Sequence, residues 1–308
     1  MGMQLAVPRL VNRLGLLIAL VVSSLLAHAN AAPPVRFGKR APLHNNAFHV
    51  IRTLAHYRHV LTPSFSKAVD ALGRGSVWLD AGAGLGRAQQ DLLDSFERSG
   101  RADEAPRLVA VSLKRPTEAQ LVDNLLSMKG RAEDLPELAN PATDRRALAR
   151  RLHGELRRFM ASPKVSYPEG FIERMPVERM AAAGTVDLIT DVLGATAYTQ
   201  HIDRVLRVYH QLLKIGGAAY LFGTRAKVEL PGREPMPILD YLRAHSSGFE
   251  IAEELNAHGA VVIVLRKSTA NLSLPRLGIA SRSKNQLPPT YVFAPRASRT
   301  ATADTPAP

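Results

Sequence analysis

The sequence predicts an α/β fold in which a parallel sheet is covered by helices on both faces. Between residues 76 and 267, short apolar runs alternate with amphipathic segments. Apolar runs without polar interruptions are typical of strands buried on both faces, and alternation with helices is typical of parallel sheets. A glycine-rich turn, residues 80–86, follows the first of these runs and opens a helix. In doubly wound sheets, ligands bind at turns in this position.

Helices and strands alternate in a regular order through the first half of the chain. Two helices are expected between Pro33 and Arg74, and the second begins with Thr62 as its cap and Pro63 at its first position. The next four elements are a strand, a helix, a strand and a helix, at residues 76–80, 87–98, 108–111 and 117–128.

A long insertion, about residues 129–168, precedes the expected third strand. Its segment from Asp144 to Met160 predicts a helix, because apolar residues recur on one stripe: Leu148, Leu152, Leu156 and Phe159. Three arginines lie on the opposite face: Arg146, Arg150 and Arg157. Those arginines have two explanations, a lid or anion-binding surface and a solvated basic face, of which the solvated face is favoured.

The second half of the chain continues the alternation. Strands are expected at residues 171–173, 186–189 and 218–222, and a closing pair at 249–255 and 261–265. The most regular helix covers residues 202–213, with apolar residues three, four and seven positions apart. The glycine pair 216–217 is expected to end that helix.

The two ends of the chain have compositions unlike the middle. Residues 1–31 resemble a secretory signal peptide, with Arg9 and Arg13 ahead of an apolar run and small residues after it. This predicts an extracytoplasmic mature chain, with no transmembrane segment of its own; a membrane tether through an uncleaved leader and a misassigned start with a cytoplasmic protein are the alternatives. Residues 268–308 are rich in proline, serine and arginine and predict a largely disordered tail, in which only 291–293 has the composition to dock.

Composition limits the chemistry of the protein. The chain of 308 residues contains no cysteine, which excludes disulfides, thiolate zinc sites, iron–sulfur clusters and a cysteine nucleophile. Its formal net charge of +13 favours anionic partners without specifying one. Three histidines, His49, His56 and His59, fall near one face of a predicted helix, but no carboxylate accompanies them, so no metal site is expected.

Three segments together resemble the class I S-adenosylmethionine-dependent methyltransferases. Residues 77–86, Val-Trp-Leu-Asp-Ala-Gly-Ala-Gly-Leu-Gly, resemble the first motif of that family. Residues 186–191 are similar to its fourth strand, and 212–221, Leu-Leu-Lys-Ile-Gly-Gly-Ala-Ala-Tyr-Leu, to the run into its fifth. The resemblance implies a doubly wound, Rossmann-like sheet of seven mostly parallel strands, the last antiparallel. It places a methyltransferase-like domain at 76–267, after a helical extension at 32–75.

The resemblance also implies the cofactor S-adenosylmethionine and residues that bind it. Asp80, Gly82, Gly84 and Gly86 match the part of the motif that lies against the methionine half of the cofactor, although a glycine turn of this kind also serves packing alone. Ser112 stands where the family usually has a carboxylate that binds both ribose hydroxyls, and a serine cannot replace both charge-assisted bonds. Glu173 matches an acidic position near the adenine, with a solvated strand-end carboxylate as its alternative.

Three residues after the fourth strand are candidates for the acceptor side. Asp191 matches a position that faces the sulfonium or the acceptor, and a cap of the following turn is the alternative. His201 has an ordinary pKa suited to a general base, although a solvated histidine is the simpler interpretation, and Tyr198 is more simply a packing residue. Methyl transfer requires alignment more than a base. The absence of an Asn-Pro-Pro-Tyr motif argues against nucleic-acid amino methylation.

The sequence therefore predicts a methyltransferase acting on a small or medium-sized acceptor, with nucleic acid not favoured. The alternative is an exported, catalytically inactive binding protein that retains the fold, because Ser112 replaces the usual carboxylate and the leader removes the chain from cytoplasmic cofactor. The sequence identifies neither the acceptor nor an oligomeric state.

Overall fold

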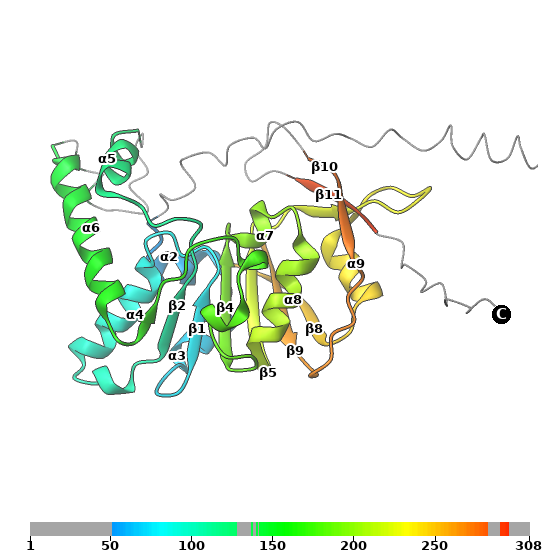
Figure 1. The fold of residues 1–308 in the computed structure, drawn as a ribbon, viewed down its shortest axis with the longest axis horizontal. Helices are drawn as coiled ribbons and strands as arrows, with labels where there is room; N and C mark the ends of the chain where they lie inside the picture. Colours follow the sequence, from blue (N-terminus) through cyan, green and yellow to red (C-terminus); the bar gives the residue numbers. More distant parts are fainter. Residues whose placement is uncertain (1–50, 128–136, 138–139, 141, 283–289, 296–308) are drawn as a thin grey trace, which may run out of the picture. The chain divides into compact units, whose positions relative to one another are not determined.

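A seven-stranded sheet forms the centre of the protein in its computed structural model, which describes residues 51–127, 137, 140, 142–282 and 290–295 (Figure 1). The strand order is β3-β2-β1-β4-β5-β9-β8. Their bounds are β1 Val77–Asp80, β2 Arg107–Ala110, β3 Val165–Ser166, β4 Val186–Val192, β5 Leu213–Phe222, β8 Phe249–Leu255 and β9 Val261–Lys267. All neighbours pair in parallel except β9, which is antiparallel to β5 and β8. The predicted seven-stranded, mostly parallel sheet is confirmed.

Helices cover both faces of this sheet, as predicted. One face packs against α2 Leu54–Val60, α3 Pro63–Asp70, α4 Arg87–Arg98, α5 Glu118–Ser127 and α6 Arg145–Ala161. The other packs against η4 Ile172–Arg174, η5 Val177–Arg179, α8 Ile202–Leu212 and α9 Ile238–His245. Because side chains alternate along a strand, Leu79 belongs to the second core and Trp78 to the first. Two short elements complete the connections: η2 Ala102–Glu104 and α7 Ala195–Tyr198.

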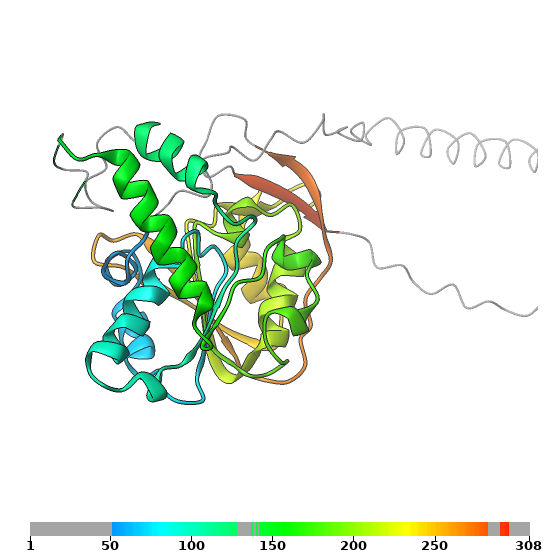
Figure 2. The ribbon, with the colours of Figure 1, turned by 60° about the vertical axis from the view of Figure 1, so that its left-hand side comes forward.

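Side-chain caps begin both an N-terminal helix and the insertion helix, and the first of these caps was predicted. Thr62 accepts a hydrogen bond from the Phe65 amide and Pro63 is the first residue of α3. Asp144 caps α6 by accepting from the amides of Arg146 and Ala147. The apolar stripe of α6 is buried and its three opposite arginines are exposed, in agreement with a solvated basic face. Figure 2 shows α5 and α6 side by side.

Two predicted boundaries are wrong. The third strand is Val165–Ser166, not residues 171–173, which include the start of η4. A two-residue strand leaves no periodic pattern, and only its pairing with Leu108 and Val109 of β2 defines it. The glycine pair does not end α8: the helix stops at Leu212 and β5 already begins at Leu213, with Gly216 at φ +84 inside the strand.

The C-terminal region departs from the disordered tail that its composition predicted. Within the described residues, β10 Leu277–Arg282 and β11 Tyr291–Pro295 join β6 Ala226–Val228 and β7 Met236–Pro237 in a second sheet, in the order β10-β11-β6-β7. Tyr291 and Phe293 are only 4% and 1% exposed. Their alternation with Val292 buries two aromatic rings against distant β6, which the proline-rich composition concealed. Residues 283–289 and 296–308 lie outside the described residues.

The predicted leader, residues 1–31, also lies outside the described part of the chain. In the residues that are described, no helix is both long enough and apolar enough to span a bilayer.

Candidate functional site

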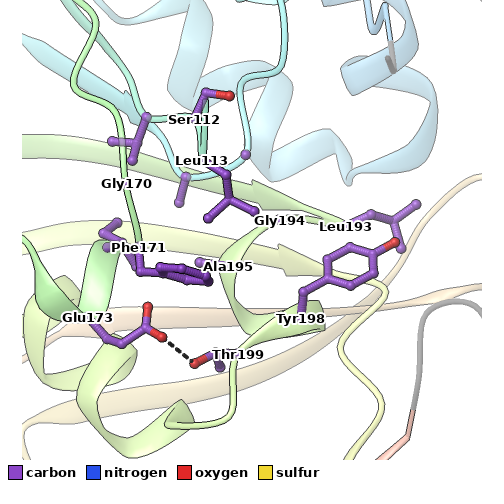
Figure 3. A pocket seen from close by; sticks show the side chains of 14 residues that line it. Ser112, Leu113, Gly170, Phe171, Glu173, Leu193, Gly194, Ala195, Tyr198 and Thr199 are labelled. Atoms are coloured by element: carbon purple, nitrogen blue, oxygen red, sulfur yellow. Dashed lines mark hydrogen bonds between the residues drawn. The ribbon is translucent and has the colours of Figure 1, made fainter. Parts of the chain in front are cut away.

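A pocket opens at the carboxyl ends of β1, β2 and β4 (Figure 3). The chain moves outward from β1 to β2 and β3 and then returns to the other side of β1 as β4, so the pocket lies where the strand order reverses. Open parallel sheets bind ligands at this point. The space between its lining atoms is about 650 Å³, including the part open to solvent.

The floor of the pocket requires glycines. Gly82 and Gly194 both line it, and a Cβ on Gly82 would lie 2.6 Å from the Gly194 Cα. Gly84 and Gly86 adopt φ of +55° and +65°, which favours glycine. A Cβ on Gly86 would meet the Phe159 ring at 2.6 Å, and the Tyr167 hydroxyl donates to the Gly84 carbonyl. Gly82 therefore borders the pocket directly, while Gly84 and Gly86 pack against the insertion.

Two predicted cofactor residues lie in the pocket wall. Ser112 lines it after β2, and its hydroxyl donates to the Lys114 carbonyl at 3.2 Å. Glu173 lines it from η4 and accepts from the Thr199 hydroxyl at 3.1 Å (Figure 3). Glu173 is the one charged side chain among the lining residues. The structure brings it there although the strand expected before it is absent.

Asp80 points away from the pocket, toward the helices that cover Trp78. Its carboxylate is 1% exposed; Oδ2 accepts from the Tyr57 hydroxyl at 2.7 Å, and Oδ1 has no hydrogen-bond partner among the described residues. Burial raises the pKa of Asp80 from 3.8 to about 7, against the opposing effects of the Tyr57 hydrogen bond and the Arg52 charge. One oxygen of the Asp80 carboxylate is therefore already hydrogen-bonded to Tyr57 of the N-terminal extension.

The three acceptor-side candidates are separated. Asp191 is fully buried and accepts from the amides of Gly194 and Thr196 and from the Tyr209 hydroxyl, at 2.9, 2.8 and 2.6 Å. This geometry matches the alternative in which Asp191 caps the turn, and burial raises its pKa. Tyr198 lines the pocket from α7. His201 is the cap residue of α8 outside the lining, and burial followed by the Arg204 charge lowers its pKa.

Leu193 and Phe171 were not among the predicted site residues. Both line the pocket, and Leu193 is the one non-glycine residue with positive φ, +49°, in the described residues. Strained backbone of this kind is concentrated at functional sites. The sequence signal for Leu193 is its position directly after a buried strand that ends at Val192.

Among the described residues, the predicted histidine face provides no group of three metal ligands. His49 lies outside the described residues, and His59 instead faces His258, with their Nε2 atoms 2.5 Å apart. In the described ranges, no group of three or more histidine, aspartate or glutamate side chains is arranged to hold a metal ion.

The chain matches no protein-family model and no curated protein. Among solved structures, it is similar to the Burkholderia thailandensis 1,6-didemethyltoxoflavin-N1-methyltransferase, at 19% identity and a TM-score of 0.32 over 87% of this chain and 94% of that one. A SAM-dependent methyltransferase from Aquifex aeolicus has 12% sequence identity and a TM-score of 0.36, over 71% of this chain and 93% of that one. The citrinin polyketide synthase CMeT domain has 16% sequence identity and a TM-score of 0.36 over 66% of this chain. This chain spans 50% of the length of that one.

The strands themselves define the fold. The sheet has the strand number, the parallel order and the antiparallel last strand that the sequence resemblance implied. The glycine turn follows β1 and opens α4 at the pocket. The chain therefore has the doubly wound, Rossmann-like arrangement of seven strands that the sequence resemblance implied.

Proposed function

We propose that this protein is an S-adenosylmethionine-dependent methyltransferase that acts on a small or medium-sized acceptor. The observation that carries the proposal is the pocket at the reversal of strand order. Gly82 and Gly194 line it from two loops that pack backbone to backbone, because a side chain on either glycine would clash with the other loop.

The residues around the pocket fit the adenosine half of the cofactor. Val111, Leu113 and Phe171 provide apolar walls for a planar ring, and Glu173 supplies an acceptor for an exocyclic amino group. Ser112 offers one hydroxyl for the ribose, a weaker contact than a carboxylate would make. Asp80, which the sequence resemblance assigned to the amino-acid half, does not line this pocket and accepts a hydrogen bond from Tyr57 instead.

The bound cofactor would supply an electrophilic methyl group. The task of the chain is then to bind, orient and exclude water, since direct displacement depends chiefly on alignment. We assign Tyr198, which lines the pocket from α7, to the acceptor side, and the hydrogen bond from Thr199 holds the Glu173 carboxylate in the pocket wall. Asp191 supports this wall by holding the turn at Gly194 and Thr196.

Calorimetric titration of the full chain with S-adenosylmethionine and S-adenosylhomocysteine tests the proposal. We expect saturable binding of both, and about tenfold tighter binding by Ser112→Asp, because a carboxylate accepts charge-assisted bonds from the ribose hydroxyls. Ser112→Ala is the matched control and should bind more weakly than the wild type. No binding at millimolar ligand by wild type and Ser112→Asp would overturn the proposal.

A second candidate is an exported, inactive binding protein with this fold. Two observations favour it: the neutral Ser112 in the pocket wall and the Tyr57 hydroxyl that already occupies Asp80. This candidate predicts that the pocket binds a ligand other than the cofactor, so the titration above separates the two.

We also propose that the chain is exported and extracytoplasmic, on the basis of the signal-like residues 1–31. Amino-terminal sequencing of the protein from its native host should find a terminus near Asn30 or Ala32 outside the cytoplasm. An intact Met1 or Gly2 in the soluble cytoplasmic fraction would contradict export and favour the active enzyme.

A further inference from the structure

Two histidines from distant parts of the chain face each other at the protein surface. His59 lies in the last turn of α2, and His258 lies in the turn that joins β8 to β9. Their Nε2 atoms are 2.5 Å apart, and the rings meet edge to face with centroids 4.1 Å apart. Both residues are exposed and neither lines the pocket, so dissolved ions can reach the two nitrogens.

A buried asparagine holds the two histidines in this arrangement. Asn256 is 7% exposed, and its side-chain amide donates to the Val60 carbonyl, next to His59, at 2.9 Å. Its side-chain oxygen accepts from the backbone amides of His258 and Ala260, each at 2.9 Å. The β8–β9 turn is therefore fixed to the end of α2, and the backbone that carries each ring is in place before a ligand binds.

The facing nitrogens suit a transition-metal ion. In a neutral imidazole, the ring nitrogen without a proton has a lone pair, and imidazole is a good ligand for Zn²⁺, Ni²⁺ and Cu²⁺. Zinc–nitrogen distances are about 2.0–2.1 Å, so a tetrahedral ion holds two of its nitrogen ligands about 3.3 Å apart. Starting from 2.5 Å, the two exposed rings would have to separate by less than about 1 Å to admit the ion.

We propose that His59 and His258 form a binding site for a divalent transition-metal ion, with water completing its coordination. Each ring binds the ion through Nε2 and keeps its proton on Nδ1. The two ligands are 199 residues apart in the sequence and meet only in the folded chain, so bound metal stabilises the folded state. The ion links α2 of the N-terminal extension to the β8–β9 hairpin. The site lies outside the pocket and does not depend on the proposed function.

Calorimetric titration of the full chain without an affinity tag tests the site, at about pH 7.5, where an ordinary histidine is mostly neutral. Zn²⁺ and Ni²⁺ should each show a tightest binding event of one ion per chain, whereas Mg²⁺, which prefers oxygen ligands, should not bind. His59→Gln and His258→Gln should each weaken Zn²⁺ binding by at least about tenfold, the loss that removal of even an outer partner of a ligand causes. The double variant should lose little more than either single variant, because the two ligands act as one unit.

His245→Gln is the matched control, because His245 is an exposed histidine in the last turn of another helix, α9. It should bind Zn²⁺ as the wild type does. In thermal unfolding, excess Zn²⁺ should raise the midpoint of the wild type and of His245→Gln, but not of the His59 or His258 variant. Equal Zn²⁺ affinity of the wild type and both site variants, or no binding by the wild type, would leave an N–H···N hydrogen bond as the only role of the pair and overturn the site. An equal loss in His245→Gln would show unspecific binding to histidines and would also overturn it.

Discussion

Replacing Asp80 with asparagine should remove the loss of stability that ionisation of Asp80 causes between about pH 4 and pH 7. The folded chain raises the pKa of Asp80 from 3.8 to about 7, chiefly by burial. Over that pH range the folded state therefore holds a proton that the unfolded state has lost, and stability falls as the pH rises. At about 1.4 kcal/mol per pKa unit, the wild type should lose on the order of 4 kcal/mol relative to Asp80→Asn across this window.

Urea denaturation at half-unit steps from pH 4 to pH 8 measures this difference. Asp70→Asn is the control: its exposed carboxylate pairs with Arg58, which lowers its pKa, so it should not titrate within the window. Parallel stability curves for wild type and Asp80→Asn would mean that Asp80 is ionised throughout, and the Tyr57 hydrogen bond would then have to outweigh burial.

Much of the fold is visible in the sequence where its determinants are local. The β1-turn-α4 unit and the start of α3 were predicted to within one residue, because glycines, caps and apolar periodicity lie within one short window. The third strand and the tail were not, because each depends on a distant partner. Val165 is a strand residue only through Leu108, and Phe293 only through Val228.

The same difference between local and distant determinants separates the features of the site that were predicted from those that were not. Gly82, Ser112, Glu173 and Tyr198 were predicted and meet in the pocket, because strand ends of a parallel sheet share one edge. The orientation of Asp80 follows from the two-residue period that places it on the Trp78 side of the sheet. Its contact with Tyr57 could not be predicted, since nothing local indicates where α2 packs.

Phe293→Ala should destabilise the protein by about 3–5 kcal/mol, the cost of truncating a buried phenylalanine. The ring is 1% exposed and belongs to the core beneath α8 and α9, and its strand pairs with β6 at Val228, which is fully buried. The same truncation in a disordered tail would leave the free energy of unfolding almost unchanged. Val292→Ala is the matched control, since Val292 is half-buried and points to the opposite side of the strand.

The loss should also reach the pocket, because β11 is attached to its wall. The Tyr291 hydroxyl donates to the backbone carbonyl of Tyr198, a pocket residue, at 3.1 Å. Chemical denaturation gives the stability change, and ligand titration of the same variants under native conditions gives the effect on the pocket. If Phe293→Ala and Val292→Ala both cost less than about 1 kcal/mol, β11 would not be part of the folded core. A stability loss without any change in ligand affinity would keep β11 in the core while removing its influence on Tyr198.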